Sequence, residues 1–189
     1  MDFKFHEVKE QDSPLLKLTV EKLGTKEIDV KELDKSLVKE INNKNLSAEE
    51  KEMIKEETAW SDEIIDSIGS IKEYEVYKEA NLSEAEKCGK KCLIRSDIDG
   101  EQKDSMGRTN IERGEQGLAP INIEGKKIEL HHIGQRADSP LAELTKDEHI
   151  GNGNDIILHD KTKESEIDRR SFDNERMEYW KEKNKGVKE

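Results

Sequence analysis

The stretch Ile128-Glu129-Leu130-His131-His132-Ile133 decides the fold, because it has the pattern of a strand that presents two consecutive histidines. Neighbouring side chains on a strand point to opposite faces of the sheet, so His131 and His132 are not expected to bind the same ion. We predict a division of labour in which one histidine is a metal ligand and the other accepts a proton.

The residues that follow supply two more histidines. Thr145-Lys146-Asp147-Glu148 is a capping box, which places His149 about one turn into a helix. The run Gly151-Asn152-Gly153-Asn154 then breaks the helix, and His159 comes after it. A histidine early in a helix can reach back to the end of the preceding strand. The pattern therefore predicts a strand-turn-strand-helix unit with a metal site between sheet and helix.

Other elements are predicted from shorter signals. Apolar residues on both sides of Glu124-Gly125 indicate a hairpin whose second arm continues into the histidine strand. Leu93-Ile94-Arg95 is predicted to be a short strand. Ser139-Pro140 is expected to open a helical turn through Leu144, and Ser165 to cap a long helix that ends near Lys183. Before the short strand, capping residues and apolar spacing predict helices over residues 13–24, 33–41, 47–58, 61–65, 71–78 and 83–89.

The motif Glu129-Leu130-His131-His132 resembles the first part of the HNH motif in colicin-type DNases, where the same four letters occur. The longer pattern resembles the LHH group of the HNH/endonuclease VII superfamily, which supplies toxin domains to polymorphic and contact-dependent toxins of bacteria. This resemblance covers roughly residues 58–185. It is carried by Trp60 to Ile65, Gly117 to Pro120, Glu129 to Gln135, Asp138 to Thr145, Glu148-His149 and Ile157-Leu158-His159.

The resemblance implies an α+β fold. Its core would be the ββα-metal unit (HNH, or His-Me finger), with a largely helical N-terminal region and a C-terminal helix. We expect residues 1–80 to be an acidic helical region, either pre-toxin or linker, and residues 81–189 to be the HNH/LHH nuclease domain.

The resemblance also implies roles for the histidines. His131 and His149 match metal ligands, and His132 matches the general base. Glycine stands at position 153, where colicin-type enzymes have a further ligand, so His159 is the candidate third ligand. Glu129 matches a glutamate that helps to orient the active site.

Asn154 is a candidate for the backbone-bracing role of the central asparagine of the HNH motif. We expect one divalent metal ion, and Mg, Mn, Zn and Ni all remain open. The arginine fork suits phosphate oxygens, although a surface ion pair is the alternative for each arginine. Arg108 is the candidate catalytic arginine, and the candidates for binding the nucleic acid are Arg113, Arg136, Arg169 and Arg170.

The resemblance implies a toxin DNase that cleaves DNA in the cytoplasm of a target cell and is inhibited by a cognate immunity protein. Residues 1–6 do not have the pattern of a secretory signal, and no apolar run approaches the roughly 20 residues that span a bilayer. We therefore expect delivery by a specialised system, with a delivery module N-terminal to this chain.

Composition leaves other readings open. The chain has 189 residues, of which 31% are hydrophobic and 41% charged, so the core must be modest. The net charge of −12 is unusual for an enzyme that binds phosphates, and residues 1–100 carry −8 of it. The acidic half is either a solvated helical surface or a cover for a basic cleft.

Cys88 and Cys92 are expected to be reduced. The alternative functions are a non-catalytic, metal-stabilised binding module and a host-cell HNH nickase.

Overall fold

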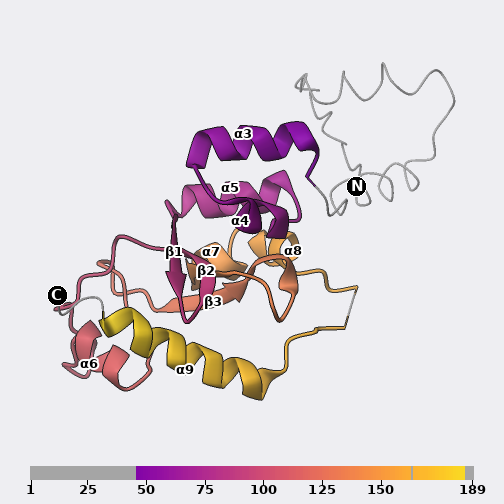
Figure 1. Ribbon diagram of the computed structural model, residues 1–189. Helices are drawn as coiled ribbons and strands as arrows, with labels where there is room; N and C mark the ends of the chain where they lie inside the picture. Colours follow the sequence, from indigo (N-terminus) through magenta and orange to yellow (C-terminus); the bar gives the residue numbers. More distant parts are fainter. Residues whose placement is uncertain (1–45, 163, 186–189) are drawn as a thin grey trace, which may run out of the picture. The chain divides into compact units, whose positions relative to one another are not determined.

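The computed structural model describes residues 46–162 and 164–185, and the helices predicted over residues 13–24 and 33–41 lie outside these ranges. Figure 1 labels the described helices α3 to α9 and the strands β1, β2 and β3. In chain order the described elements are α3 (Ala48–Thr58), α4 (Asp62–Ser67), α5 (Ile71–Glu79), β1 (Ser83–Lys87), β2 (Lys90–Ile94), α6 (Asn110–Glu115), β3 (Ile128–His132), η1 (Ile133–Gln135), β4 (Leu141–Thr145), α7 (Lys146–Ile150), α8 (Asn154–Leu158) and α9 (Arg169–Lys185).

The strands described here form one sheet in the order β1-β2-β4-β3. The β1–β2 and β3–β4 pairs are antiparallel, whereas β2 and β4 run parallel. The register pairs Ile128 with Thr145 and His132 with Leu141. Strand β4 leads directly into α7, so β3, β4 and α7 form the predicted ββα unit and the α+β class is confirmed.

Apolar side chains cover both faces of the sheet because strand residues alternate in direction. On one face, Leu93, Ala142 and Leu144 pack in a core with residues of α3, α4, α5 and α8. On the other face, Cys92 and Leu130 pack against α9. Figure 1 shows α9 on the side of the sheet opposite to α3, α4 and α5. The helices between residues 48 and 79 therefore share a hydrophobic core with the sheet.

Three of the predicted helices are confirmed by α3, α4 and α5. Helix α3 begins at the predicted capping box, in which Ser47 Oγ accepts a hydrogen bond from the N–H of Glu50 and a Glu50 carboxylate oxygen accepts one from the N–H of Ser47. Ser61 and Ser70 are the N-cap residues of α4 and α5, but only Ser70 caps with its side chain, which accepts a hydrogen bond from the N–H of Glu73. Side-chain capping satisfies N–H groups that have no partner within the helix.

The helix predicted over residues 83–89 is wrong, since this segment forms β1 and a tight turn. Cys88 and Gly89 both have left-handed backbone conformations, with φ of 52° and 70°. Two such residues in a row make the turn whose twist matches that of a two-stranded hairpin. Cys92 lies buried in β2, and no disulfide joins it to Cys88.

The helical turn predicted from Ser139 to Leu144 is also wrong, because Leu141–Thr145 is strand β4. All five residues of β4 are buried, as expected for a central strand with a neighbour on each side. A short apolar run of this kind does not distinguish a buried strand from a buried helix by its period. The hairpin predicted around Glu124-Gly125 is reduced to a turn with an isolated bridge between Ile121 and Lys127.

The C-terminal helix is confirmed, but it begins later than predicted. Ser165 Oγ accepts a hydrogen bond from the N–H of Ile167, which is a local turn. Helix α9 starts at Arg169, and Asp168 Oδ1 accepts a hydrogen bond from the N–H of Ser171 in its first turn. None of the helices in the described ranges is long and apolar enough to span a membrane.

Candidate active site

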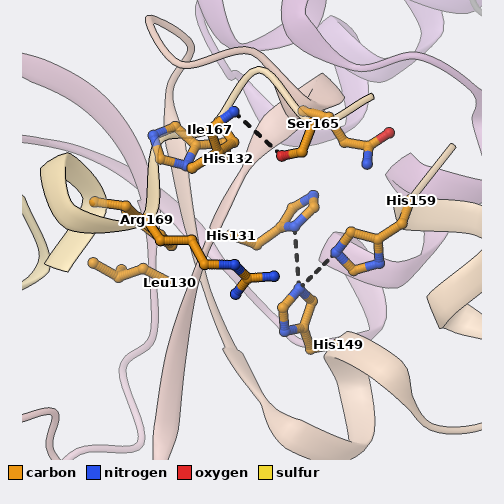
Figure 2. Close-up of a pocket in the computed structure, with 10 residues that line it drawn as sticks. Leu130, His131, His132, His149, His159, Ser165, Ile167 and Arg169 are labelled. Atoms are coloured by element: carbon orange, nitrogen blue, oxygen red, sulfur yellow. Dashed lines mark hydrogen bonds between the residues drawn. The ribbon is translucent and has the colours of Figure 1, made fainter. Parts of the chain in front are cut away.

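Three histidines converge at the open end of the ββα unit, as Figure 2 shows. His131 comes from β3, His149 from α7, and His159 from the C-cap of α8. His149 Nε2 lies 3.2 Å from His131 Nδ1 and 3.1 Å from His159 Nε2. One ring nitrogen from each residue lies within 4.8 Å of the others. The structure thus brings together the three ligands predicted from the sequence.

The ring nitrogens on the outer side of His149 and His159 are held by acidic residues. Glu129 Oε2 lies 2.8 Å from His149 Nδ1. His159 Nδ1 lies 3.1 Å from the backbone carbonyl oxygen of Asp155 and 3.2 Å from Asp155 Oδ1. A carboxylate on one ring nitrogen fixes the tautomer, so that the other nitrogen presents its lone pair. The two Nε2 atoms that face the centre are therefore oriented as metal ligands are.

The chemistry of this donor set fits a divalent cation. Burial lowers the pKa of His131 well below its ordinary value, and the neighbouring charges of His149 and His159 lower it further, so the ring is neutral near pH 7. Burial likewise lowers the pKa of His159. Imidazole lone pairs that meet at one point repel one another unless a proton or a cation lies between them. His131, His149 and His159 can therefore hold a metal ion.

Local structure explains how His159 reaches the cluster. Helix α7 begins at the predicted capping box of Thr145 and Glu148. After α7, Asn152 and Gly153 have φ of 52° and 86°, which turns the chain back on itself. Asn154 Nδ2 donates a hydrogen bond to the carbonyl of Glu148 at 2.8 Å and so holds α8 against α7. This reversal places His159 beside His149.

His132 lies on the other face of β3, toward α9. Its side chain is buried, and its ring centroid is 4.6 Å from that of Phe172. His132 Nε2 lies 3.0 Å from Glu175 Oε2, and Glu175 Oε1 accepts a hydrogen bond from Lys90 Nζ at 2.6 Å. Burial alone would raise the pKa of Glu175, but His132 and Lys90 together bring it below its ordinary value.

His132 and the three converging histidines line the same pocket, which has a volume of about 200 Å³. Among its lining residues, Arg169 is the only lysine or arginine. Figure 2 shows the guanidinium of Arg169 directed toward the histidine cluster. The lining residues are Leu130, His131, His132, Gln135, His149, His159, Ser165, Ile167, Arg169 and Phe172.

The other predicted arginines do not line this pocket. Arg108 binds Asp104 through Nε at 3.0 Å and through a terminal nitrogen at 2.8 Å. Arg113 also binds Asp104 and donates a second hydrogen bond to the carbonyl of Ala119. Their donors are thus engaged within the loop before β3. Arg136 contacts Ser67 Oγ at 3.4 Å in the adjacent groove, and Arg170 is exposed.

Sequence reasoning did not identify Glu175 or Asp155 as residues of the site. Phe172, Glu175 and Tyr179 recur at spacings of three and four on α9, which places them on one face of the helix. That spacing was the available signal for Glu175. For Asp155, the signal was its position four residues before His159 on the same short helix.

Residues 109–186 match a family described as LHH, a nuclease of the HNH/ENDO VII superfamily with conserved LHH. The matched segment includes Leu130-His131-His132. No solved structure matches the chain.

Proposed function

We propose that the chain is a metal-dependent endonuclease that hydrolyses DNA, and the match of residues 109–186 to the LHH nucleases of the HNH/ENDO VII superfamily supports this. The observation that carries the proposal is the placement of the two adjacent histidines. His131 joins the three-histidine cluster, whereas His132 lines the same pocket from the other face of β3. One pocket thus contains a metal-ligand set and a separate imidazole.

In this proposal His132 is the general base. Its imidazole takes a proton from a water molecule as the water oxygen bonds to phosphorus. The bond from phosphorus to the 3′ oxygen breaks, and the departing 3′ oxygen takes a proton from solvent water. His131, His149 and His159 would hold a divalent ion, and such an ion would supply charge neutralisation at the phosphate. Arg169 binds a neighbouring phosphate oxygen through its guanidinium. An all-imidazole ligand set favours Zn or Ni over Mg, which prefers oxygen ligands.

The biological part of the proposal is a bacterial toxin. The nuclease would reach the cytoplasm of a competing cell through a delivery module N-terminal to this chain, and a cognate immunity protein would bind and inhibit it. The resemblance of Glu129-Leu130-His131-His132 to colicin-type DNases supports this reading. Toxicity on expression in the cytoplasm, relieved by the product of a neighbouring gene, is the expected observation. Expression without toxicity would favour a host-cell nickase.

A non-catalytic metal-stabilised module is the second candidate, and the net charge of −12 favours it because acidic surfaces bind basic partners. Such a module has no need for a second, non-ligating histidine in the same pocket. Loss of the fold on chelation, together with no activity in the metal-loaded protein, would support this candidate against the nuclease.

The test is cleavage of supercoiled plasmid and of structured RNA with Mg²⁺, Mn²⁺, Zn²⁺ or Ni²⁺. We expect metal-dependent cleavage of DNA that stops on chelation. His132→Ala should lower kcat by about 10²- to 10⁴-fold and still bind the metal, because the base is lost and the ligands remain. Lys181→Ala, an exposed change on α9, is the control. Intact DNA under all four metals would contradict the proposal. Cleavage of RNA alone would show that the substrate is RNA and not DNA.

A further inference from the structure

Glu175 is the carboxylate nearest to the proposed base, although it lies far from His132 in the chain. Glu175 is in α9, and its Oε2 is 3.0 Å from His132 Nε2. The carboxylate is only partly exposed, with 26% of the side chain accessible, and the imidazole is 4% accessible. A contact in this setting is less screened by solvent than a surface pair.

The buried Nε2 of His132 makes no hydrogen bond with the described residues, and the Glu175 carboxylate lies 3.0 Å from it. We propose that Glu175 is the positioning residue of His132, an electrostatic partner that keeps Nε2 protonated so that Nδ1 presents its lone pair to the pocket. The inference rests on the proposed nuclease function and assigns Glu175 a part in it. A carboxylate next to one imidazole nitrogen fixes the tautomer and the orientation of the ring. Glu129 does not have this part, since it contacts His149 instead.

Lys90 completes the arrangement from the opposite side. Its ammonium donates to Glu175 Oε1 at 2.6 Å and to the carbonyl of Ala137 at 3.4 Å. Each carboxylate oxygen of Glu175 therefore has a different partner. The lysine, which begins β2, keeps the carboxylate ionised and fixes its rotation, so that Oε2 remains on His132.

The helix that carries Glu175 is itself anchored to the sheet. Tyr179 Oη donates to Glu143 Oε1 at 2.9 Å, and Lys183 Nζ contacts both oxygens of Glu143. Phe172, one turn before Glu175, packs on the His132 ring. A positioning residue acts only when its own backbone is fixed, and these contacts fix α9 on both sides of Glu175.

The experiment compares Glu175→Ala, Glu175→Gln and the matched control Glu178→Gln on the same helix. Plasmid cleavage is measured with the metal that gives the highest activity. Glu175→Ala should lower kcat by about 10- to 100-fold with KM for plasmid unchanged, and Glu175→Gln by less, because the amide oxygen still lies beside Nε2–H. In a His132→Ala background, Glu175→Ala should cause no further loss, since the group it positions is gone.

A second readout does not depend on activity. Nitrogen-15 NMR of the His132 ring in Zn²⁺-loaded protein should report the Nε2-protonated tautomer, with a mixture of tautomers in Glu175→Ala. Wild-type kcat in Glu175→Ala would overturn the proposal, as would an equal loss in the His132→Ala background. If the wild type cleaves no nucleic acid, the proposed function fails. The ring tautomer then decides the positioning by itself, and an unchanged tautomer in Glu175→Ala overturns it.

Discussion

Glu129 Oε2 lies 2.8 Å from His149 Nδ1, and this contact joins the first strand of the ββα unit, β3, to its helix, α7. Glu129 is two positions before His131 on β3, so both side chains point to the same face of the sheet. One strand therefore supplies a candidate ligand and the carboxylate that orients another. Because side chains alternate along a strand, Glu129 and His131 share one face of the sheet and His132 lies on the opposite face.

Replacing Glu129 should weaken metal binding more than it affects proton transfer to His132, the proposed base. We expect Glu129→Gln to lower the affinity for Zn²⁺ or Ni²⁺ by about 10- to 100-fold, because His149 loses the charged acceptor that fixes its tautomer. Competition with a chromogenic chelator measures this affinity. Glu124→Gln, in the exposed turn before β3, is the control and should leave it unchanged. Equal affinities for Glu129→Gln and wild type would show that the contact has no part in metal binding.

Arg169→Ala should weaken binding of DNA with a smaller effect on the chemical step. Arg169 is the only cationic side chain among the residues that line the pocket. Removing one phosphate contact should raise KM and reduce the slope of log affinity against log salt by about 0.9. Binding of a fluorescent duplex across a salt series tests this, with Lys181→Ala as the comparison. A slope equal to that of the wild type would show that Arg169 makes no contact with a DNA phosphate.

The buried pair of Glu143 and Lys183 should matter for stability. Glu143 is fully buried and Lys183 is 16% accessible. Glu143→Ala is expected to lower the free energy of unfolding by about 3–5 kcal/mol, since it leaves the Lys183 ammonium without its acceptor in a poorly solvated place. The double change Glu143→Leu with Lys183→Met should cost less, because both charges are removed together. Urea unfolding measures both variants, and a loss below about 1 kcal/mol in Glu143→Ala would contradict the expected effect.

The loop around Asp104 should contribute to acid sensitivity. Burial alone would raise the pKa of Asp104, but hydrogen bonds from the backbone N–H of Arg108 and from the side chains of Arg108 and Arg113 hold it well below its ordinary value. A carboxyl whose pKa is lowered by folding stabilises the fold above its unfolded pKa of about 3.9, and this contribution is lost as the pH falls below that value.

Asp104→Asn should therefore lower the free energy of unfolding at pH 7 and change it much less at pH 2. Urea titrations at the two pH values test the difference, with Asp147→Asn as an exposed control. If Asp104→Asn lost as much stability at pH 2 as at pH 7, the ion pairs of Asp104 would not be the cause.

The residues that carry the proposed chemistry could be found in the sequence because their signals are local. Strand alternation separates His131 from His132, and the capping box at Thr145 places His149 in the first turns of α7. Both depend on residues within four positions of one another. The same kind of reasoning failed at β1 and β4, where pairing between strands outweighed a capping pattern and a helical turn.

Contacts between distant parts of the chain were decided only by the tertiary structure. The turn at Asn152 and Gly153 brings His159 onto His149, and the packing of α9 on the sheet brings Glu175 onto His132. Asp104 also binds Arg113, nine positions further along the chain, and neither Arg108 nor Arg113 lines the pocket. The sequence by itself determined which side chains can do the chemistry, since type and periodicity are properties of neighbouring residues. Their partners depend on how sheet and helices pack, because that packing minimises exposed apolar surface over the whole domain.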